Sequence, residues 1–409
     1  MVYIFRDIEK ELIKFIKSPE IIAVVGARQV GKTTLITNIV NKFNKKKVKV
    51  ITFDNIDILN LFVNNIESFI KLYIKDVDIL FIDELHYAKD SGRSLKYIYD
   101  TNKHIKIIIS GSSAIELSIQ SLRYLVGRVV SFELYSFSFS EYLRSKDSKL
   151  YDLYLSSNYK ETILKILNRY FEEYLLFGGY PRIVLEKDIN SKKKLLSNIY
   201  NTYVLRDIKE LENIKDDFKL YTLIKALSIQ IGNLINYSEL SVISGYNYVQ
   251  LKSVLNIFEK TYVCKFISPF YTNKRTELVK SKMIYFLDLG IRNSIINNFS
   301  LDRSDLGALK ENFVLIELLK KNYDVRYWRT KHGAEVDFII EINNKIIPIE
   351  VKSNLKNENL TNSLISFITK YKPEKAYVVS NSFESQRKIN NTNVIFIPFV
   401  KFTTLLLEL

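Results

Sequence analysis

A glycine-rich loop that stands between an apolar run and a helical pattern constrains this chain more than any other feature. Residues 26–33 read GARQVGKT, a complete match to G-x-x-x-x-G-K-T. The run Ile21–Val25 before the loop predicts a buried strand, and Thr34–Val40 after it predicts the first turns of a helix. A glycine-rich turn without a ligand would share these letters, but the position between strand and helix predicts a phosphate-binding loop.

The spacing within the loop has a mechanical reason. Gly26 and Gly31 let the backbone curl so that its N–H groups point at phosphate oxygens. Lys32 is expected to reach the β- and γ-phosphates, and the Thr33 hydroxyl is expected to ligate Mg²⁺. We therefore expect the chain to bind ATP with Mg²⁺. The other residues predicted to line the nucleotide are Ala27, Arg28, Gln29, Val30 and Thr34.

Two adjacent carboxylates follow another predicted strand further along the chain. The apolar run Ile79–Ile82 ends in Asp83 and Glu84. Asp83 would hold Mg²⁺ directly or through water, and Glu84 would polarise a water that attacks the γ-phosphate. A strand that simply ends in solvent-exposed acids would have the same sequence, but the position of these acids after a phosphate loop favours an ATPase.

Three further side chains are candidates for supporting roles. The next predicted strand ends in ISGSS, where Ser110, or else Ser113, would position the attacking water. Arg128 precedes the fifth predicted strand and would either supply positive charge to a γ-phosphate in a neighbouring subunit or pair with an acid. Arg28 is expected to pack against adenine or solvent.

Length and charge limit the class of protein. A chain of 409 residues is expected to form two to four domains. Its net charge of +15 attracts polyanions such as DNA, unless the Lys-, Ile- and Asn-rich composition reflects a coding bias. One cysteine excludes a disulfide framework or thiolate zinc site. No apolar run approaches the ~18 residues of a membrane span, so we expect a soluble, cytoplasmic protein without a membrane partner.

The chain is expected to be an α/β protein with several modules. Short apolar runs alternate with helical stretches up to residue 145, which implies parallel strands joined by crossover helices. The expected domains are an ATPase core at 1–145, a helical lid or connector at 146–225, a winged-helix-like module at 226–290 and a nuclease-like α/β domain at 307–409. The expected linkers are Asn- and Lys-rich segments near 187–195 and 292–306.

The winged-helix-like prediction rests on two helical patterns followed by a short strand pattern. One helix starts at Tyr237–Leu240, another covers Tyr248–Phe258, and a β-wing is expected around Val263–Pro269. Basic side chains in this region would contact DNA phosphates or simply cover solvated helix faces. They are Lys252, Lys260, Lys265, Lys274 and Arg275. Such modules also bind proteins.

The N-terminal motifs together resemble a known family. The segments GARQVGKT, LFIDELHYA, ISGSSA and LVGRVVSFELYSFSFSEYL resemble the AAA-type ATPases with an AAA_14 domain, over about residues 1–145. The segments LFGGYPRIVL and YVLRDI and the region 200–409 resemble the DUF4143 domain that is fused to it. The resemblance implies a P-loop NTPase of the ASCE type with strand order 5-1-4-3-2 and the catalytic Glu on an additional strand.

A second group of charged residues lies near the C-terminus. Asp337 falls within one predicted strand, and Glu350 and Lys352 lie two apart on the next, so the latter two share a face. A hairpin turn at Asn343-Asn344 would make the strands neighbours. Carboxylates that converge on Mg²⁺ or Mn²⁺ beside a lysine suit phosphodiester hydrolysis. Glu311 on the preceding helix would complete the metal site.

This second pattern resembles the PD-(D/E)XK nuclease superfamily. The resemblance rests on Glu311, Asp337, Glu350 and Lys352 and on the order helix, three strands, helix, strand; it departs from the family in having no Pro before Asp337. Two alternatives stay open, a strand that shows these charges to solvent and a nuclease fold that binds DNA without cutting it.

The predicted function is therefore ATP hydrolysis coupled to a C-terminal module that binds or cleaves DNA. The alternative is a signalling switch of the STAND type, in which the C-terminal modules bind protein and do not cut DNA. A homo-oligomer or a partner protein is compatible with either function.

Overall fold

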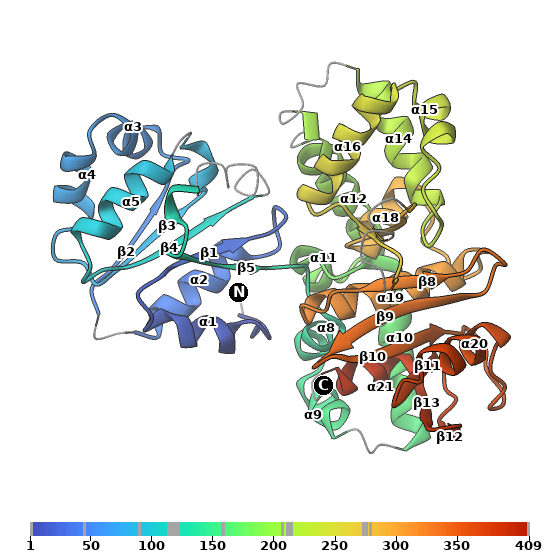
Figure 1. Ribbon diagram of the computed structural model, residues 1–409. Coiled ribbons are helices and arrows are strands. Elements are labelled where there is room, and N and C mark those ends of the chain that lie inside the picture. Colours follow the sequence, from blue (N-terminus) through green and yellow to red (C-terminus); the bar gives the residue numbers. More distant parts are fainter. Residues whose placement is uncertain are drawn as a thin grey trace. The chain divides into compact units, whose positions relative to one another are not determined.

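The computed structural model describes residues 3–43, 46–88, 91–112, 123–156, 160–205, 208–209, 216–271, 277 and 280–406. The chain divides into two compact units, Met1–Phe137 with Lys260–Tyr262 and Ser138–Glu259 with Val263–Leu409 (Figure 1). The first boundary lies at Phe137 and not at the predicted residue 145, because Phe139 and Tyr142 are buried among aromatic rings of the second unit.

The first unit is a parallel sheet of five described strands. They are β1 (Ile21–Val25), β2 (Val48–Thr52), β3 (Ile79–Asp83), β4 (Lys106–Gly111) and β5 (Val129–Glu133). Their order is β2-β3-β4-β1-β5, which confirms the predicted order 5-1-4-3-2. The central strands β1 and β3 are buried along their whole length, as apolar strands covered on both faces must be.

Helices cover both faces of this sheet (Figure 1). The segments are α1 (Glu9–Ile16), α2 (Lys32–Asn41), α3 (Ile56–Asn64), α4 (Ile66–Tyr73), η1 (Leu85–Tyr87), α5 (Ser91–Thr101) and η2 (Arg123–Leu125). In Figure 1, α1 and α2 lie on one side of the sheet and α3, α4 and α5 on the other. The phosphate loop follows β1 and Asp83 is the last residue of β3, so both lie at the carboxyl ends of strands, the edge where open α/β sheets bind ligands.

One implication of the resemblance is wrong in detail. Glu84 does not stand on an additional strand, because it directly follows Asp83 at the end of β3. The strand inserted between β3 and β1 is β4, and β4 carries Ser110. Because β4 lies between them, β1, which precedes the loop, and β3, which ends in Asp83, are each about 4.8 Å from β4 and are not neighbours.

The second unit opens with helices that surround an aromatic core. They are α8 (Phe139–Lys146), α9 (Ser148–Leu155), α10 (Glu161–Phe177), α11 (Pro181–Leu185), α12 (Ile189–Asn198), the π-helical segment η3 (Ile199–Val204) and α18 (Leu289–Ile295). A capping box of Ser138 and Glu141 starts α8. Phe139 and Phe171 both pack against Phe313, and Phe171 also packs against Phe399. Phe313 and Phe399 come from segments far away in the sequence. The predicted linker 187–195 is therefore mostly helix, since α12 occupies it.

Three helices and a small sheet occupy the predicted winged-helix-like region. They are α14 (Asp217–Ile229), α15 (Tyr237–Ser244), α16 (Tyr248–Lys260), β6 (Cys264–Ile267) and β7 (Met283–Phe286). The partner of β6 is β7, which lies further along the chain than the wing expected around Val263–Pro269. Both strands are short and buried, so they carry little of the alternation that identifies a hairpin in sequence.

The C-terminal part of this unit is a mixed sheet of six described strands. Its segments are α19 (Leu306–Lys320), β8 (Arg326–Arg329), β9 (Glu335–Ile342), β10 (Lys345–Val351), α20 (Asn362–Tyr371), β11 (Lys375–Ser380), β12 (Ser385–Ile389), β13 (Thr392–Pro398) and α21 (Phe399–Leu405). The strand order is β12-β13-β11-β10-β9-β8. Asn343 and Asn344 both adopt positive φ between β9 and β10, the geometry of a tight hairpin turn, so the predicted hairpin is confirmed.

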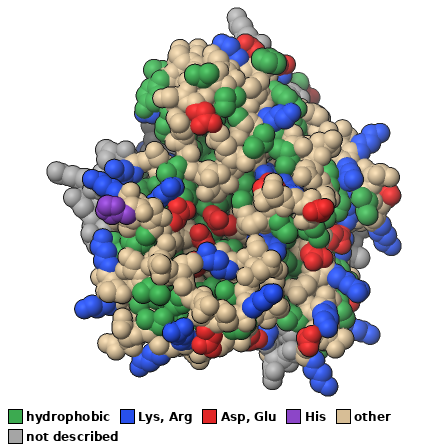
Figure 2. Space-filling view, turned by 90° about the vertical axis from the view of Figure 1, so that its right-hand side faces the viewer, with side chains coloured by type: hydrophobic (Ala, Val, Ile, Leu, Met, Phe, Trp, Pro, Cys, Tyr) green, Lys and Arg blue, Asp and Glu red, His purple; other side chains and the backbone are tan. Residues whose placement is uncertain are grey.

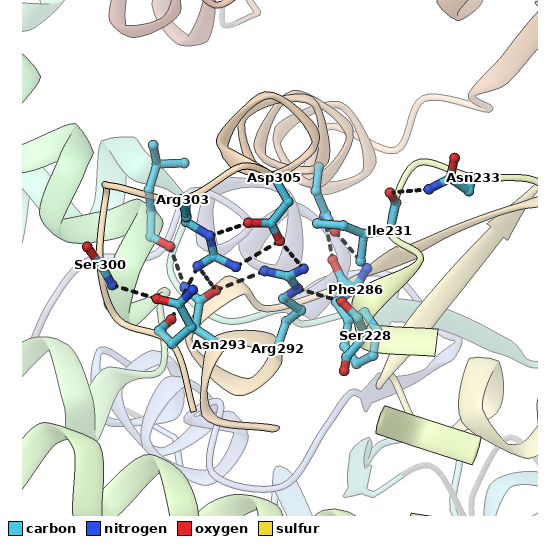
Figure 3. Close-up of polar contacts among 12 residues, drawn as sticks. Ser228, Ile231, Asn233, Phe286, Arg292, Asn293, Ser300, Arg303 and Asp305 are labelled. Carbon is cyan, nitrogen blue, oxygen red and sulfur yellow. Dashed lines mark hydrogen bonds and ion pairs between the residues drawn. The ribbon is translucent and has the colours of Figure 1, made fainter. Parts of the chain in front are cut away.

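The predicted linker 292–306 instead holds a buried ionic network (Figure 3). The Arg292 guanidinium donates to Asp305 and to the Ser228 carbonyl at 2.8 Å. Arg303 donates to both Asp305 oxygens and to Asn293 at 2.9 Å. Burial alone would raise the pKa of Asp305, but the two arginines lower it to about 2. An Asn-rich segment is thus tied into the core by arginines.

Candidate functional site

The phosphate loop is formed in the first unit. Gln29 and Gly31 adopt positive φ of 63° and 96°, which turn the chain back on itself before α2. A Cβ on Gly26 would lie 2.1 Å from the Leu134 carbonyl oxygen, so only glycine fits there. Gly31 caps α2 without a side-chain hydrogen bond, which leaves the helix N-terminus open to an anion.

Lys32 is buried inside the curl of the loop. Its Nζ donates to the carbonyl oxygens of Gly26 and Ala27, at 2.9 Å each. The loop is held from outside by Arg6, which donates to the Val30 carbonyl at 2.9 Å and to the Tyr135 carbonyl at 2.7 Å. Sequence reasoning missed Arg6, and no motif marks it. Its burial beside the loop is visible only in the fold.

Asp83 is the point where three elements meet. Its Oδ2 accepts from the Thr33 hydroxyl at 2.7 Å, and its Oδ1 accepts from the Ser110 hydroxyl and from the Glu84 amide at 3.1 Å. The structure thus brings Thr33, Asp83 and Ser110 together, as their strand-end positions predicted. Ser110 contacts the acid itself, so its role toward water stays a prediction, and Ser113 lies outside the described residues.

Glu84 stands beside this point with its carboxylate near the loop. Its backbone is left-handed, with φ 54°, and its side chain is 24% exposed. Burial alone would raise the pKa of the Glu84 carboxyl, but His86, Lys32 and Arg28 together hold it below its usual value. Arg28 therefore acts on Glu84 through its charge, an effect that its expected position against adenine or solvent did not include.

Arg128 lies at the other edge of the sheet. Its carbonyl accepts from the Ile21 amide, where β1 begins, whereas the loop follows the end of β1. The Arg128 side chain pairs with Asp100 at 3.2 Å and lies over the Tyr99 ring. The sequence left two roles open for Arg128, an ion pair with an acid and a contact with a γ-phosphate in a neighbouring subunit. The structure contains the ion pair. A role in a neighbouring subunit stays a prediction.

These residues fit a nucleoside triphosphate with Mg²⁺. The open helix N-terminus and Lys32 offer donors and positive charge to phosphates, and Thr33 with Asp83 offers the oxygen ligands that Mg²⁺ prefers. The exposed Thr34 follows on the first turn of α2, which is where the predicted nucleotide contacts end.

A second cluster of acids lies in the second unit. Extending the β9–β10 register by one pair beyond Ile349 and Phe338 sets Glu350 opposite Asp337, on one face. Glu350 accepts from Lys352 at 2.8 Å and from the Thr361 hydroxyl at 2.9 Å. Asp337 accepts from the Val351 amide at 2.6 Å.

Glu311 joins this cluster from α19. It accepts a hydrogen bond from the hydroxyl of Tyr285 on β7. Burial and the nearby Asp337 raise the pKa of Glu311 well above its usual value. Burial and the Glu350 charge likewise raise the pKa of Asp337 to about 7, although the Val351 amide and Lys352 oppose this. These acids therefore crowd one another.

The predicted metal site is not formed by these acids as they stand. Among the described residues, no group of three or more His, Cys, Asp or Glu side chains is arranged to hold a metal ion. The reason is local, because Glu311, Asp337 and Glu350 each turn toward a donor of their own. The residues thus converge in position without sharing a ligand point.

Two of the basic side chains near the small sheet already have partners. Lys252 lies over the rings of Tyr248 and Tyr237, and Lys265 pairs with Glu259 at 2.8 Å. Lys274 and Arg275 lie outside the described residues. Figure 2 shows basic side chains scattered among acidic ones on the face it displays, without one continuous basic stripe, and acidic side chains gathered near its centre.

The fold and the loop define the first unit as a P-loop NTPase of the AAA type. Residues 18–143 match the AAA domain family AAA_14. Residues 168–302 match DUF8612 and residues 306–400 match DUF4143, both domains of unknown function. The DUF4143 resemblance is thus shorter than the predicted 200–409.

Relatives extend over most of the chain. It is 30% identical to the uncharacterized protein MJ1544 of Methanocaldococcus jannaschii, over 87% of this chain and 78% of that protein. It is 24% identical to an uncharacterized protein of Haemophilus influenzae, over 95% and 96% of the two chains. Among solved structures it is similar to the Walker-type ATPase PABY2304 of Pyrococcus abyssi, with 15% identity over 72% of this chain and 96% of that chain and a TM-score of 0.49.

The chain belongs to the family of MJ1544. It carries an AAA_14 ATPase domain and a DUF4143 domain. In the part of the chain that the structure describes, none of the helices has the length and apolarity required to cross a membrane.

Proposed function

We propose that this chain hydrolyses ATP at the loop of its first unit and uses the reaction as a switch. One observation carries the proposal. The Asp83 carboxylate accepts hydrogen bonds from the hydroxyls of Thr33 and Ser110. The next residue, Glu84, interacts electrostatically with Lys32. An acid that holds Mg²⁺ and an acid that polarises water are the two carboxylates that phosphoryl transfer to water requires.

Each residue has a role in this proposal. Lys32 leaves the carbonyls of Gly26 and Ala27 for phosphate oxygens, and the loop amides fix the phosphates in place. Thr33 and Asp83 would hold Mg²⁺, which spreads the charge that develops on the phosphates. Glu84 accepts a hydrogen bond from the attacking water and takes its proton at a carboxylate oxygen.

The test separates binding from turnover. In Glu84→Gln we expect ATP binding to persist and phosphate release to fall at least about 100-fold, the size of a general-base contribution. Glu133→Gln is the matched control, since Glu133 ends β5 at the same edge of the sheet and is exposed. Turnover in Glu84→Gln close to that of the wild type would remove Glu84 from this role.

We further propose that the second unit acts on DNA, with Glu311, Asp337, Glu350 and Lys352 as its reactive cluster. The specific support is the convergence of these side chains, with two acids of raised pKa beside a lysine. As these described acids are placed, they do not fit a metal ion.

A panel of linear, circular and branched DNAs tests this second proposal. The protein is incubated with ATP and either Mg²⁺ or Mn²⁺, and DNA binding and cleavage are scored in increasing salt. Steep salt dependence of binding supports a DNA-acting unit. Cleavage that Asp337→Asn abolishes supports cutting, and cleavage unchanged in Asp337→Ala assigns the cluster to binding. Tight nucleotide retention without DNA binding would favour a STAND-type switch with a protein partner.

A further inference from the structure

The short helical turn η1 carries a histidine back toward Glu84. The left-handed conformation of Glu84 reverses the chain after β3, and η1 closes with the Tyr87 amide on the Glu84 carbonyl at 3.2 Å. Leu85 is buried beneath the turn. As a result, the His86 ring stands beside the acid two residues before it, with Nδ1 at 3.0 Å from Oε2.

The polar atoms of this pair are buried and unsatisfied. The His86 side chain is only 7% exposed. Among the described residues, neither ring nitrogen of His86 nor Oε2 of Glu84 has a hydrogen-bond partner, because the close approach of Nδ1 does not have hydrogen-bond geometry. Buried polar atoms without partners and a glutamate with positive φ both lower stability, and both are concentrated at functional sites.

We propose that His86 is the positioning residue for Glu84, holding its carboxylate toward the phosphate loop by donating a hydrogen bond from Nδ1 when nucleotide is bound. This inference rests on the proposed role of Glu84 in ATP hydrolysis. Active-site hydrogen bonds are often long or poorly aligned without substrate and tighten when it binds, which is the state of this pair.

The surroundings of the pair support an orienting role. The Tyr87 ring lies against the His86 ring, with centroids 4.3 Å apart, and limits its rotation. Lys32 and Arg28 belong to the loop and act electrostatically on the carboxylate that His86 approaches. A protonated Nδ1 of an imidazole is a hydrogen-bond donor, and at this distance it can direct one oxygen of a carboxylate.

The experiment compares His86→Ala, His86→Asn and His104→Ala in the full chain. Asparagine keeps a donor near the place of Nδ1, and His104 is an exposed histidine in the turn before β4 that serves as the control. Phosphate release is measured over a range of ATP concentrations, with binding of a fluorescent ATP analogue and thermal unfolding alongside.

We expect His86→Ala to lower kcat about tenfold to hundredfold, with KM and analogue affinity within about twofold, because only alignment of the general base is lost. His86→Asn should recover part of kcat, and His104→Ala should match the wild type. A purely structural role would instead lower the melting temperature or analogue binding together with kcat, without rescue by asparagine, and that pattern overturns the inference.

Glu84→Gln separates failure of this inference from failure of the proposed function. If Glu84→Gln loses turnover while His86→Ala retains it, His86 does not position Glu84 and the proposed function stands. If Glu84→Gln retains turnover, both fail. In Glu84→Gln with His86→Ala, we expect no loss beyond that of Glu84→Gln alone, since both changes act on one group.

Discussion

Glu84 in the first unit and Asp337 in the second are both partly buried carboxylates near a lysine, yet their pKa values move in opposite directions. Glu84 is surrounded by His86, Lys32 and Arg28, and its pKa is lowered despite burial. Asp337 has Lys352 nearby but also Glu350 and Glu335, and its pKa rises to about 7. The difference teaches that the fold supplies positive charge to the first site and leaves the second with too little.

The first prediction removes the positive charge at the first site. In Lys32→Ala we expect the Kd for ATP to rise at least about 100-fold and turnover to be lost, since loss of one partner of a buried charge pair costs about 2–5 kcal/mol. Calorimetric titration measures binding. Lys10→Ala is the control, on α1 and exposed. Unchanged ATP affinity in Lys32→Ala would contradict the view that the fold supplies functional positive charge to the first site.

The second prediction concerns Asp305, whose carboxylate is paired with two arginines, Arg292 and Arg303. In Asp305→Asn we expect a loss of about 3 kcal/mol in the free energy of unfolding, because Arg292 and Arg303 are left buried and unpaired. The only tryptophan in the sequence, Trp328, is buried in the second unit, so its fluorescence reports unfolding of that unit.

The matched control and the pH dependence sharpen this prediction. Glu374→Gln removes the exposed pair with Lys345 and should change stability by less than about 1 kcal/mol. Because the folded pKa of Asp305 lies below its unfolded value, its contribution is present above pH ~4 and disappears as the pH falls through about 2. A contribution of Asp305 that is equal at pH 2 and pH 6 would contradict the lowered pKa.

The third prediction tests the second site, where Asp337 has too little positive charge nearby. Because the pKa of Asp337 is raised on folding, its contribution to stability is greatest below pH ~4 and is lost as the pH rises through about 7. Asp337→Asn should therefore gain stability relative to the wild type as the pH rises from 5 to 8, by about 2–3 kcal/mol, because the ionisation penalty grows by about 1.4 kcal/mol per pH unit up to the folded pKa of about 7. Trp328 fluorescence in urea measures this, with the exposed Glu341→Gln as control. A parallel pH dependence of the two proteins would show that Asp337 is ionised at little penalty.

The smallest effect is expected at the exposed pair of Arg128 and Asp100. In Arg128→Ala we expect a loss below about 1 kcal/mol, because both side chains are at least one-third exposed. The role in a neighbouring subunit is tested by mixing Arg128→Ala with Lys32→Ala protein. Recovered turnover in the mixture would support a shared site, whereas no recovery together with a monomeric sedimentation profile would exclude it.

Sequence patterns predicted the first unit well because each of its signals is local. The strand β1, the loop and α2 follow one another without interruption, and hydrophobic runs located the remaining strands to within a few residues. The loop and the Asp83–Glu84 pair were found because strand ends place them. The sequence shows that His86 lies two residues after Glu84. It did not predict a role for His86, because one histidine in a short turn gives no periodic signal.

Other features escaped because they depend on distant partners. The edge strand β12, Ser385–Ile389, is polar and largely exposed, so its sequence has no apolar alternation. Arg292 and Arg303 lie in the predicted linker 292–306, yet both side chains are buried and bonded to Asp305 and to neighbouring carbonyls. The acids of the second unit were located correctly on their strands, but the donors toward which they turn, such as Tyr285, come from elsewhere in the chain.

The aromatic core of the second unit has a consequence for synthesis of the chain. Phe139 packs against Phe171, Phe171 packs against Phe399, and Tyr154 is hydrogen-bonded to Thr403 across 249 residues of sequence. At about 5–20 residues per second, a ribosome needs roughly 12–50 s to add that length. Until this interval ends, α8, α9 and α10 lack the helix α21 that covers them, while the sheet of the first unit is already complete. The nascent second unit is therefore the part of this protein that requires protection from aggregation.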